Sequence, residues 1–406
     1  MEQQDRSWTL STALREWQLR ALDLWRANSD HGTVSVVTGA GKTMLALACL
    51  ADLHARRPEL RSLIVLPTVQ LLEQWRVALE AHLGLRNDTV ALIGGGYRGR
   101  IDRAVTLAVA NSARRLSKGF FRSDQWALIA DECHHLGSRE NSLILHHVEY
   151  SATLGLSATP FRQYDQAFEE IIAPVLGPVI FALDYESAVN MGLLVPFQLW
   201  NVRVPLTANE RQQFDRMDRA IAREMSELHQ AGVRTSERLK MLLFRRKRTS
   251  HSVRSRLPAA AGVMESFRGR RTLLFHESIP AAESLYRTLA GQGYRVRLYH
   301  SRMTPPARYE SLLLFQTGQV DALVTCRALD EGFDIPAAEA GVLVASSNSG
   351  RQRIQRIGRV LRPFGHKDSA TVVSLYALNT EAELLRRESE RLEGVSRVRW
   401  LEATGP

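Results

Sequence analysis

Short apolar runs alternate along the first half of the chain with longer segments whose apolar residues recur at helical spacing. Runs of this length predict strands, and the longer segments predict amphipathic helices. We expect strands at the start of 34–55 and of 105–116 and within 60–67, 126–132 and 154–160, and helices in the remainder of 34–55 and over 68–83. Strands that alternate with helices in this way predict a mostly parallel sheet covered by helices on both faces.

A second series of the same kind begins after residue 269. We expect strands within 270–278, 294–300, 320–326, 340–346 and 371–378, a helix over 279–293 closed by Gly291 and Gly293, and a terminal helix over 383–394. The predicted fold class is therefore α/β. The predicted organisation is a first domain over 1–195, a basic helical linker over 196–269, a second domain over 270–382, and a C-terminal helix and tail over 383–406.

Length and composition fit a globular protein of two or three domains, since the chain has 406 residues, of which 45% are hydrophobic and 24% are charged. Its three cysteines give no disulfide framework and indicate a reducing compartment, so we expect a cytoplasmic location. The polar N-terminus is unlike a secretory signal, and no apolar run approaches the length of a membrane span. We therefore expect no membrane partner.

Positive charge is concentrated in one segment. The formal net charge is +10 and the sequence pI is about 9.9, which suits a polyanionic partner. Residues 205–270 hold 15 Lys and Arg residues against 7 Asp and Glu residues. Two interpretations stay open for its densest part, 238–256: a solvated helix with Met241–Phe244 packed inward, and a surface that faces nucleic acid. The second interpretation assigns nucleic-acid contacts to Arg245, Arg246, Lys247 and Arg248.

The stretch WALIADECHHLG, residues 126–137, ends an apolar run in five side chains that can each bind a metal or move a proton. Neighbouring side chains of a strand point to opposite faces, so these five cannot converge on one ion, and zinc sites use spaced pairs. A nucleophilic Cys133 is also disfavoured, because the partners of a catalytic cysteine are normally distant in sequence. The remaining interpretation is a nucleotide-hydrolysing site, which needs an Asp and a Glu at a strand end and a phosphate loop.

A candidate phosphate loop is present at TGAGKT, residues 38–43, where a predicted strand passes into a predicted helix. Successive backbone N–H groups and a helix N-terminus favour bound phosphate, and Lys42 would reach the β- and γ-phosphates. The G-x-x-x-x-G-K-[ST] pattern asks for a glycine at position 36, where this chain has Val36. The predicted strand-to-helix context supports the loop despite this departure.

The acidic pair that ends the 126–132 run acquires a role once the loop is recognised. We expect Thr43 and Asp131 to hold Mg²⁺. Glu132 would orient or deprotonate the attacking water.

Seven short segments resemble, in family order, the motifs of the superfamily 2 helicase and translocase core. They are LREWQ (14–18) for the adenine-recognising segment, TGAGKT (38–43) for motif I, LPTVQLLEQW (66–75) for motif Ia, DECH (131–134) for motif II, SATP (157–160) for motif III, TCRALDEGFDIP (325–336) for motif V and QRIGRVLR (355–362) for motif VI. LREWQ, VLPTVQLLEQW, CRALDEGFDIP and LLVPFQLWNVRVPLTANER (193–211) are most similar to the XPB-like and type III restriction helicase-like branch.

The resemblance implies two tandem RecA-like domains, each a mostly parallel sheet flanked by helices, with ATP in the interdomain cleft. ATP binding would favour closure of the cleft, and hydrolysis would permit reopening. The residues that the resemblance assigns to ATP are Gln18 for adenine, Thr38, Gly39, Ala40, Gly41, Lys42 and Thr43 for phosphate, Gly332 and Asp334 near the ribose, and Gln355 near the γ-phosphate.

Motif VI would supply arginine fingers. Arg359 and Arg362 resemble these fingers and would complete a catalytic set with Lys42, Asp131 and Glu132. An alternative stays open, in which the arginines of 351–362 form a solvated basic helix face.

The resemblance also assigns residues to coupling and to nucleic acid. His134, Ser157 and Thr159 would couple the ATP site to the nucleic-acid site, although Ser157 and Thr159 could instead cap the turn before Pro160. Backbone contacts with nucleic acid are implied for Thr68, Ser112, Ser301 and Thr325. Contacts of this kind position a strand without reading its sequence.

The function that the sequence favours is a nucleic-acid-dependent ATPase that uses ATP and Mg²⁺ and acts as a DNA helicase or translocase. One alternative is an ATP-gated clamp or regulatory subunit of a repair or phage-defence complex with little unwinding. Another is an RNA helicase, because backbone contacts do not separate DNA from RNA. The preference for DNA over RNA rests on the branch resemblance. The sequence shows no nuclease constellation, so a role in defence would require a protein partner such as a nuclease.

Overall fold

The computed structural model describes residues 8–86, 88–99, 103–116, 121, 125–158, 166–233, 235–326, 337–345, 353, 356, 358, 360–365, 367–392 and 394–403. The chain divides into two compact units, of which unit 1 runs to Ala188 and unit 2 begins at Val189. This division falls within helix α6 (Tyr185–Asn190), a few residues before the predicted domain end at 195. In the part of the chain that is described, no helix is long and apolar enough to cross a membrane.

Unit 1 is built on an eight-stranded sheet with the order β4-β3-β5-β2-β6-β7-β1-β8. Only β3 and β4 pair antiparallel, so the mostly parallel sheet predicted from the sequence is confirmed. Its strands are β1 (His31–Val36), β2 (Arg61–Leu66), β3 (Val90–Gly94), β4 (Tyr97–Arg98), β5 (Val105–Val109), β6 (Trp126–Asp131), β7 (Ala152–Ser157) and β8 (Val179–Leu183).

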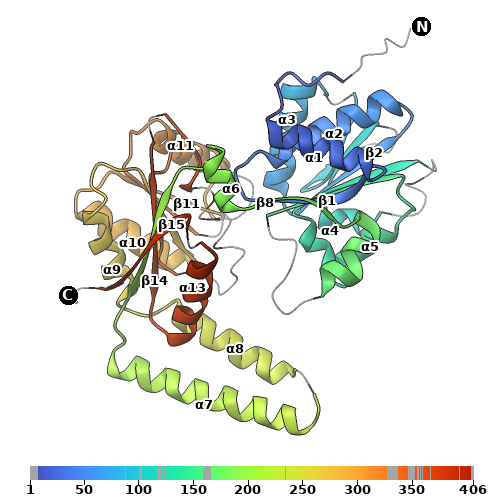
Figure 1. Ribbon diagram of the computed structural model, residues 1–406. Helices are drawn as coiled ribbons and strands as arrows, with labels where there is room; N and C mark the ends of the chain where they lie inside the picture. The colour runs from blue at the N-terminus through green and yellow to red at the C-terminus, as the bar shows by residue number, and fades with distance from the viewer. Residues whose placement is uncertain are drawn as a thin grey trace. The chain divides into compact units, whose positions relative to one another are not determined.

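Helices cover both faces of this sheet (Figure 1). One face carries α1 (Glu16–Ala27), α2 (Lys42–Arg56) and α3 (Val69–Leu83), and the other carries α4 (Ala110–Ala113), the short helical segments Cys133–Gly137, Asn141–His146 and Phe168–Ile172, and α5 (Ala173–Leu176). Leu128 and Ala130 of β6 pack into the apolar cluster beneath α4 and α5. Because side chains alternate along a strand, Asp131 points to the face that α3 covers.

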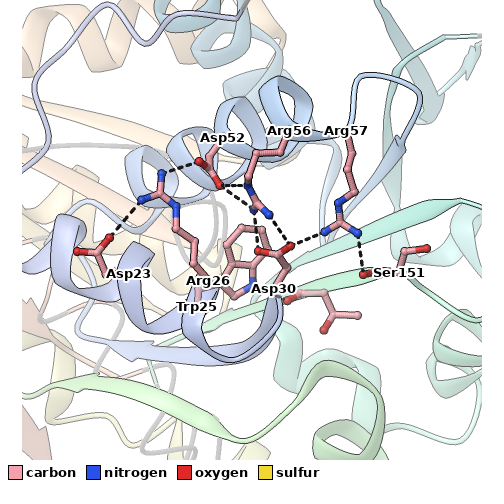
Figure 2. A network of polar contacts seen from close by, with 9 residues as sticks. Asp23, Trp25, Arg26, Asp30, Asp52, Arg56, Arg57 and Ser151 are labelled. Carbon is pink, nitrogen blue, oxygen red and sulfur yellow. Dashed lines mark hydrogen bonds and ion pairs between the residues drawn. The ribbon is translucent and has the colours of Figure 1, made fainter.

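A row of alternating charges joins the last turns of α1 and α2 (Figure 2). Arg26 of α1 pairs with Asp52 of α2 at 2.5 Å, and Arg56 pairs with both Asp52 and Asp30 at 2.7 Å. Asp30, which precedes β1, also pairs with Arg57. The row links both helices to the sheet edge opposite the phosphate loop, since α2 begins directly after the loop and is about 20 Å long.

Unit 2 contains a seven-stranded sheet with the order β11-β12-β10-β13-β14-β9-β15, in which all pairs are parallel. Its strands are β9 (Phe197–Arg203), β10 (Thr272–His276), β11 (Val296–His300), β12 (Ala322–Cys326), β13 (Ala340–Leu343), β14 (Ala370–Tyr376) and β15 (Ser396–Glu402). The helices that pack around it are α9 (Arg256–Glu265), α10 (Ile279–Gly291), α11 (Pro305–Gln316) and α13 (Asn379–Arg391). Gly291 lies inside α10, and only Gly293 adopts the left-handed φ, +83°, that the predicted glycine closure requires.

The segment 196–269 is more than the helical linker that the sequence predicts. It opens with β9, which pairs with β14 on one side and β15 on the other and is therefore an interior strand of the sheet. Its buried and partly exposed residues alternate, so it lacks the continuous apolar run that marks the strands predicted from the sequence. The rest of the segment forms α7 (Ala208–Gln230), α8 (Glu237–Ser250) and α9.

Helices α7 and α8 form a hairpin that extends from the sheet of unit 2 (Figure 1). The inward packing expected for Met241–Phe244 is wrong, because Met241 is 65% exposed and Phe244 is 66% exposed. Helix α8 packs mainly against α7, so only a narrow stripe of its surface is buried. Leu239 and Ser250 are the fully buried residues of α8.

Candidate active site

The loop between β1 and α2 has the backbone of a phosphate cradle. Gly39 and Gly41 have φ of +98° and +104°, values that side chains other than glycine rarely adopt. A Cβ atom on Gly41 would also lie 2.9 Å from Nε2 of Gln18. Val36, the departure from the motif, is the last residue of β1 and is buried in the sheet. The chain thus keeps glycine where the backbone requires it, and a β-branched residue suits position 36.

The polar groups of this loop fit a bound polyphosphate. No side chain caps the N-terminus of α2, and its first turn contains no acidic residue. Thr43 lies in this first turn. The buried hydroxyl of Thr38 finds no hydrogen-bond partner among the described residues. Lys42 donates from Nζ to the carbonyl oxygens of Val36 at 2.8 Å and Val37 at 3.4 Å, so its ammonium lies at the start of the loop. N–H groups, a hydroxyl and an ammonium are the donors that phosphate oxygens accept from.

Helix α1 contacts the loop through its first turn. Gln18 donates from Nε2 to the carbonyl oxygen of Gly41 at 2.9 Å, and Arg15 donates to that of Ala40 at 3.3 Å. Gln18 also accepts a hydrogen bond from the backbone N–H of Arg15 at 2.8 Å, which fixes the orientation of its amide. The residue expected at adenine therefore touches the phosphate loop directly.

Asp131 and Glu132 stand at the C-terminal end of β6. Glu132 adopts a left-handed φ of +49°, and its backbone N–H donates to Oδ1 of Asp131 at 3.0 Å. The indole of Trp75, on α3, donates to Oδ2 of Asp131 at 2.9 Å. Trp75 was missed by sequence reasoning, because a tryptophan at helical spacing among leucines is typical of a core position.

His134 connects the acidic motif to the end of β7. Its Nδ1 lies 3.1 Å from the hydroxyl of Ser157 and 3.3 Å from Oε2 of Glu132. The ring is fully buried, so both contacts are made away from solvent. The structure thus brings together two of the three predicted coupling residues, while Thr159 lies outside the described residues.

Strand order arranges the candidates along one edge of the unit 1 sheet. Parallel strands end at a common edge, and β5, β2, β6, β7 and β1 are neighbours in that order. The residues at or just after the ends of these strands, in the same order, are Ser112, Thr68, the Asp131–Glu132 pair, Ser157 and the phosphate loop. The residues predicted for ATP therefore gather at one side of this edge, and those predicted for nucleic acid gather at the other.

The cysteine of the acidic motif belongs to the core. Cys133 is fully buried in the apolar cluster that includes Leu136 and Trp126. Across the described part of the chain, no group of three or more His, Cys, Asp or Glu side chains is arranged to hold a metal ion. Mg²⁺ commonly takes one or two carboxylates from a protein and the rest of its ligands from phosphate and water, so a single Asp131 fits this cation.

Two arginines of the 351–362 stretch, Arg353 and Arg356, are buried within unit 2. Arg356 is 0% exposed and pairs with Glu277 at 2.8 Å. Arg353 pairs with Glu388 at 2.8 Å and donates to the hydroxyl of Ser374 at 2.9 Å. The alternative of a solvated basic helix face is therefore wrong for these two residues. Arg362 is partly buried, and four predicted ATP residues lie outside the described part of the chain: Gly332, Asp334, Gln355 and Arg359.

The nucleic-acid candidates differ in exposure. Thr68 caps α3, where its hydroxyl accepts from the N–H of Leu71 at 3.3 Å, and Ser301 is exposed after β11. Thr325 lies inside β12 and is 1% exposed, so the contact expected of its side chain is not supported. A residue just before a strand end can belong to the sheet interior, which the motif resemblance alone does not reveal.

The four basic residues predicted on α8 also divide. Arg246 pairs with Asp218 of α7 and donates to the hydroxyl of Thr380 at 3.0 Å, so it holds the hairpin together and does not face outward. Arg245 and Arg248 are exposed and line a cavity of about 630 Å³ with Arg254, and Lys247 is partly exposed. Arg245 and Arg248 therefore remain the stronger candidates for contact with a polyanion.

Two family models match the chain. The type III restriction enzyme, res subunit, matches residues 11–162, and the helicase conserved C-terminal domain matches residues 255–363. They fall on units 1 and 2 and together match more than half of the chain.

Curated relatives are similar over most of this chain. The DNA 3'-5' translocase XPB2 of Sulfurisphaera tokodaii is 23% identical over 369 residues, which cover 86% of this chain and 78% of that protein. The putative DNA 3'-5' helicase Rad25 of Haloarcula marismortui is 29% identical over 87% of this chain and 51% of its own length. The DNA 3'-5' helicase XPB of Mycobacterium tuberculosis is 25% identical over 90% of this chain and 60% of its own length. The chain thus spans only about half to three quarters of these relatives.

Solved structures share the fold. Dbp5 of Saccharomyces cerevisiae bound to RNA and ADP BeF3 superposes with a TM-score of 0.64 at 16% identity, over 96% of this chain and 90% of that one. The type ISP restriction-modification enzyme LlaBIII bound to DNA gives a TM-score of 0.69 at 15% identity, over 97% of this chain and 31% of that one. Both identities are low, so these likenesses speak for the architecture of tandem RecA-like domains. With both family models and the motif order in agreement, the chain belongs to the superfamily 2 helicases, on the branch of the XPB-like and type III restriction enzyme-like proteins.

Proposed function

We propose that this chain is a DNA-stimulated ATPase that moves along DNA. The observation that carries the proposal is the order of residues along the edge of the unit 1 sheet, where the phosphate loop, Ser157 and the acidic pair adjoin Thr68 and Ser112. A nucleic acid bound at Thr68 and Ser112 would lie one or two strands from the acidic pair and three or four strands from the phosphate loop. Strand spacing makes the first distance about 5–10 Å and the second about 15–20 Å, so the acidic pair is the part of the nucleotide site that bound nucleic acid would influence most directly.

Different residues of unit 1 would bind the phosphates, hold the metal ion and activate the attacking water. Thr38 and the N–H groups of the loop bind phosphate, and Lys42 offsets the charge on its outer oxygens. Thr43 and Asp131 would hold Mg²⁺, which supplies further charge neutralisation when bound. Glu132 orients the attacking water and accepts its proton.

Further parts of the proposal rest on motif resemblance. Arg359 and Arg362 of unit 2 would act as arginine fingers, and the His134–Ser157 contact would transmit the state of the nucleotide to the nucleic-acid side of the edge. DNA is preferred over RNA because the XPB-like relatives are named as acting on DNA. We also propose a cytoplasmic location and, for any role in defence, a separate nuclease partner.

A triplex-displacement experiment tests movement along DNA. A third DNA strand bound to a duplex should be released in the presence of ATP by the full chain, and release should be lost in Lys42→Ala. A duplex of RNA should support much less release. ATP-dependent binding to DNA with no release would contradict movement and favour the clamp, while release on RNA alone would favour an RNA helicase.

A further inference from the structure

The indole of Trp75 has a specific partner in the candidate active site. Trp75 is 1% exposed, and its N–H donates to Oδ2 of Asp131 at 2.9 Å. Trp75 lies on α3, one face of which is buried through Leu72, Trp75, Leu79 and Leu83. A buried indole N–H needs an acceptor, and here the acceptor is the carboxylate that we place at the metal.

The two oxygens of Asp131 are held from different directions. The backbone N–H of Glu132 donates to Oδ1 at 3.0 Å, and Trp75 donates to Oδ2. The terminal torsion of an aspartate is intrinsically broad, so hydrogen bonds to the separate oxygens decide how the carboxylate plane is turned.

We propose that Trp75 is a positioning residue that turns the carboxylate of Asp131 toward the phosphate loop. The inference rests on the proposed function, because it takes Asp131 as a ligand of Mg²⁺. It goes further in assigning α3, and not only the acidic motif, to the metal site. Loss of a hydrogen bond to a metal-ligating group typically lowers metal affinity or activity by 10–100-fold.

A pair of matched variants separates positioning from packing. Trp75→Phe keeps an aromatic ring in the core and removes the N–H. Trp25→Phe is the control, because Trp25 is 2% exposed in the same unit and its indole donates at 2.8 Å to the backbone carbonyl of Thr153, on a different strand. Both variants lose the same volume and one buried hydrogen bond, but only the first touches Asp131.

The full chain is titrated with Mg²⁺ at a fixed concentration of a fluorescent ATP analogue, and binding is followed by fluorescence anisotropy. In Trp75→Phe, half-maximal binding should require about tenfold more Mg²⁺. The Mg²⁺ requirement of Trp25→Phe should match the wild type. Equal requirements in the two folded variants would overturn the inference. Binding by the wild type that does not depend on Mg²⁺ would instead overturn the proposed metal site and, with it, the role of Trp75.

A second measurement does not depend on the variants folding. The chain has seven tryptophans, so a ¹⁵N-labelled wild-type sample gives a small set of indole N–H resonances. The Trp75 resonance should shift when Mg²⁺ and a non-hydrolysable ATP analogue are added together, while that of Trp25 stays in place. A Trp75 resonance that does not respond would contradict the inference.

Discussion

Single residues show which parts of a motif the backbone enforces. Gly39 and Gly41 occupy left-handed conformations, whereas position 36 is an ordinary strand residue, so Val36 is compatible with the loop. The departure from the motif at 36 therefore has no structural cost here. A motif position that is occupied by glycine in other loops need not be one at which glycine is required.

Lys367 is a residue whose environment changes its chemistry. Its ammonium is buried in unit 2 and donates to the carbonyl oxygens of Val360, of Ala338 at 2.5 Å and of Arg362 at 2.9 Å. Burial, opposed by the charge of Glu339 and reinforced by Arg271 and Arg270, lowers the pKa of Lys367 to about 8. Through its contact with Arg362, this lysine supports the end of the motif VI segment.

The lowered pKa gives a pH dependence of stability. The unfolded chain holds the proton of Lys367 up to about pH 10.5, while the folded chain releases it near pH 8. Because the unfolded state binds more protons in this window, the free energy of unfolding should rise with pH through this group, by at most about 1.4 kcal/mol per pH unit. Urea denaturation of wild type and Lys367→Met between pH 7 and 10.5 checks this. The wild type should gain stability relative to the variant, and parallel curves would contradict the assignment.

Sequence predicts the charged residues of the site better than their supports. Lys42, Asp131 and Glu132 stand out because polar residues interrupt apolar runs at strand ends. Trp75 and Lys367 do not, because an apolar residue at helical spacing and a lysine in a polar stretch are ordinary. Their roles come from contacts across the fold, to Asp131 and to three carbonyl groups, which no local pattern contains.

Helix α1 is held by polar contacts at both of its ends. Helix α1 meets the phosphate loop through Gln18 in its first turn and meets α2 through Arg26 in its last. The pKa of Asp52 is subject to burial, which would raise it, but hydrogen bonds from Arg26 and Arg56 outweigh burial and the pKa is lowered. The ion pairs therefore stabilise the folded state wherever Asp52 is ionised.

Removing this carboxylate should loosen α1. Asp52→Asn should lower the free energy of unfolding by about 1–2 kcal/mol at pH 7, because hydrogen bonds between charged groups are lost from a partly buried site. The matched control is Asp23→Asn, which removes an exposed partner of Arg26 within α1 and should cost about 0.5 kcal/mol or less. The folded pKa is depressed, so the Asp52 effect should persist above about pH 4 and fade below it. Denaturant titrations at pH 7 and pH 3.5 measure both, and equal losses in the two variants would contradict the link.

Sequence patterns predict buried elements better than half-buried ones. The apolar runs of β1, β2, β5, β6, β7 and β10–β14 identify strands, and the predicted alternation of strands and helices is confirmed. Strand β9 alternates and β15 is mostly exposed, so neither offers an apolar run. In α8, four consecutive apolar residues suggest a core contact, but a two-helix hairpin has no second layer to cover Met241 and Phe244.

At the scale of the whole molecule, the two units share one design and differ in chemistry. Each has a mostly or wholly parallel sheet with motif residues at the carboxyl ends of its strands, where ligand sites in such sheets usually lie. Unit 1 supplies the phosphate loop and the acidic pair. Unit 2 supplies the arginine-rich motif and the basic hairpin, which accounts for much of the positive charge of the chain. Binding to nucleic acid is therefore expected to weaken as salt is raised.

The measurement that tests the central claim most directly is steady-state ATP hydrolysis by the full chain, alone and with single-stranded DNA, duplex DNA or RNA, beside Glu132→Gln. The variant keeps the size of the side chain and removes the proton acceptor. We predict that DNA stimulates hydrolysis and that Glu132→Gln lowers the stimulated rate by about 10²-fold or more. Hydrolysis that no polymer stimulates, or that survives in Glu132→Gln, would contradict the account.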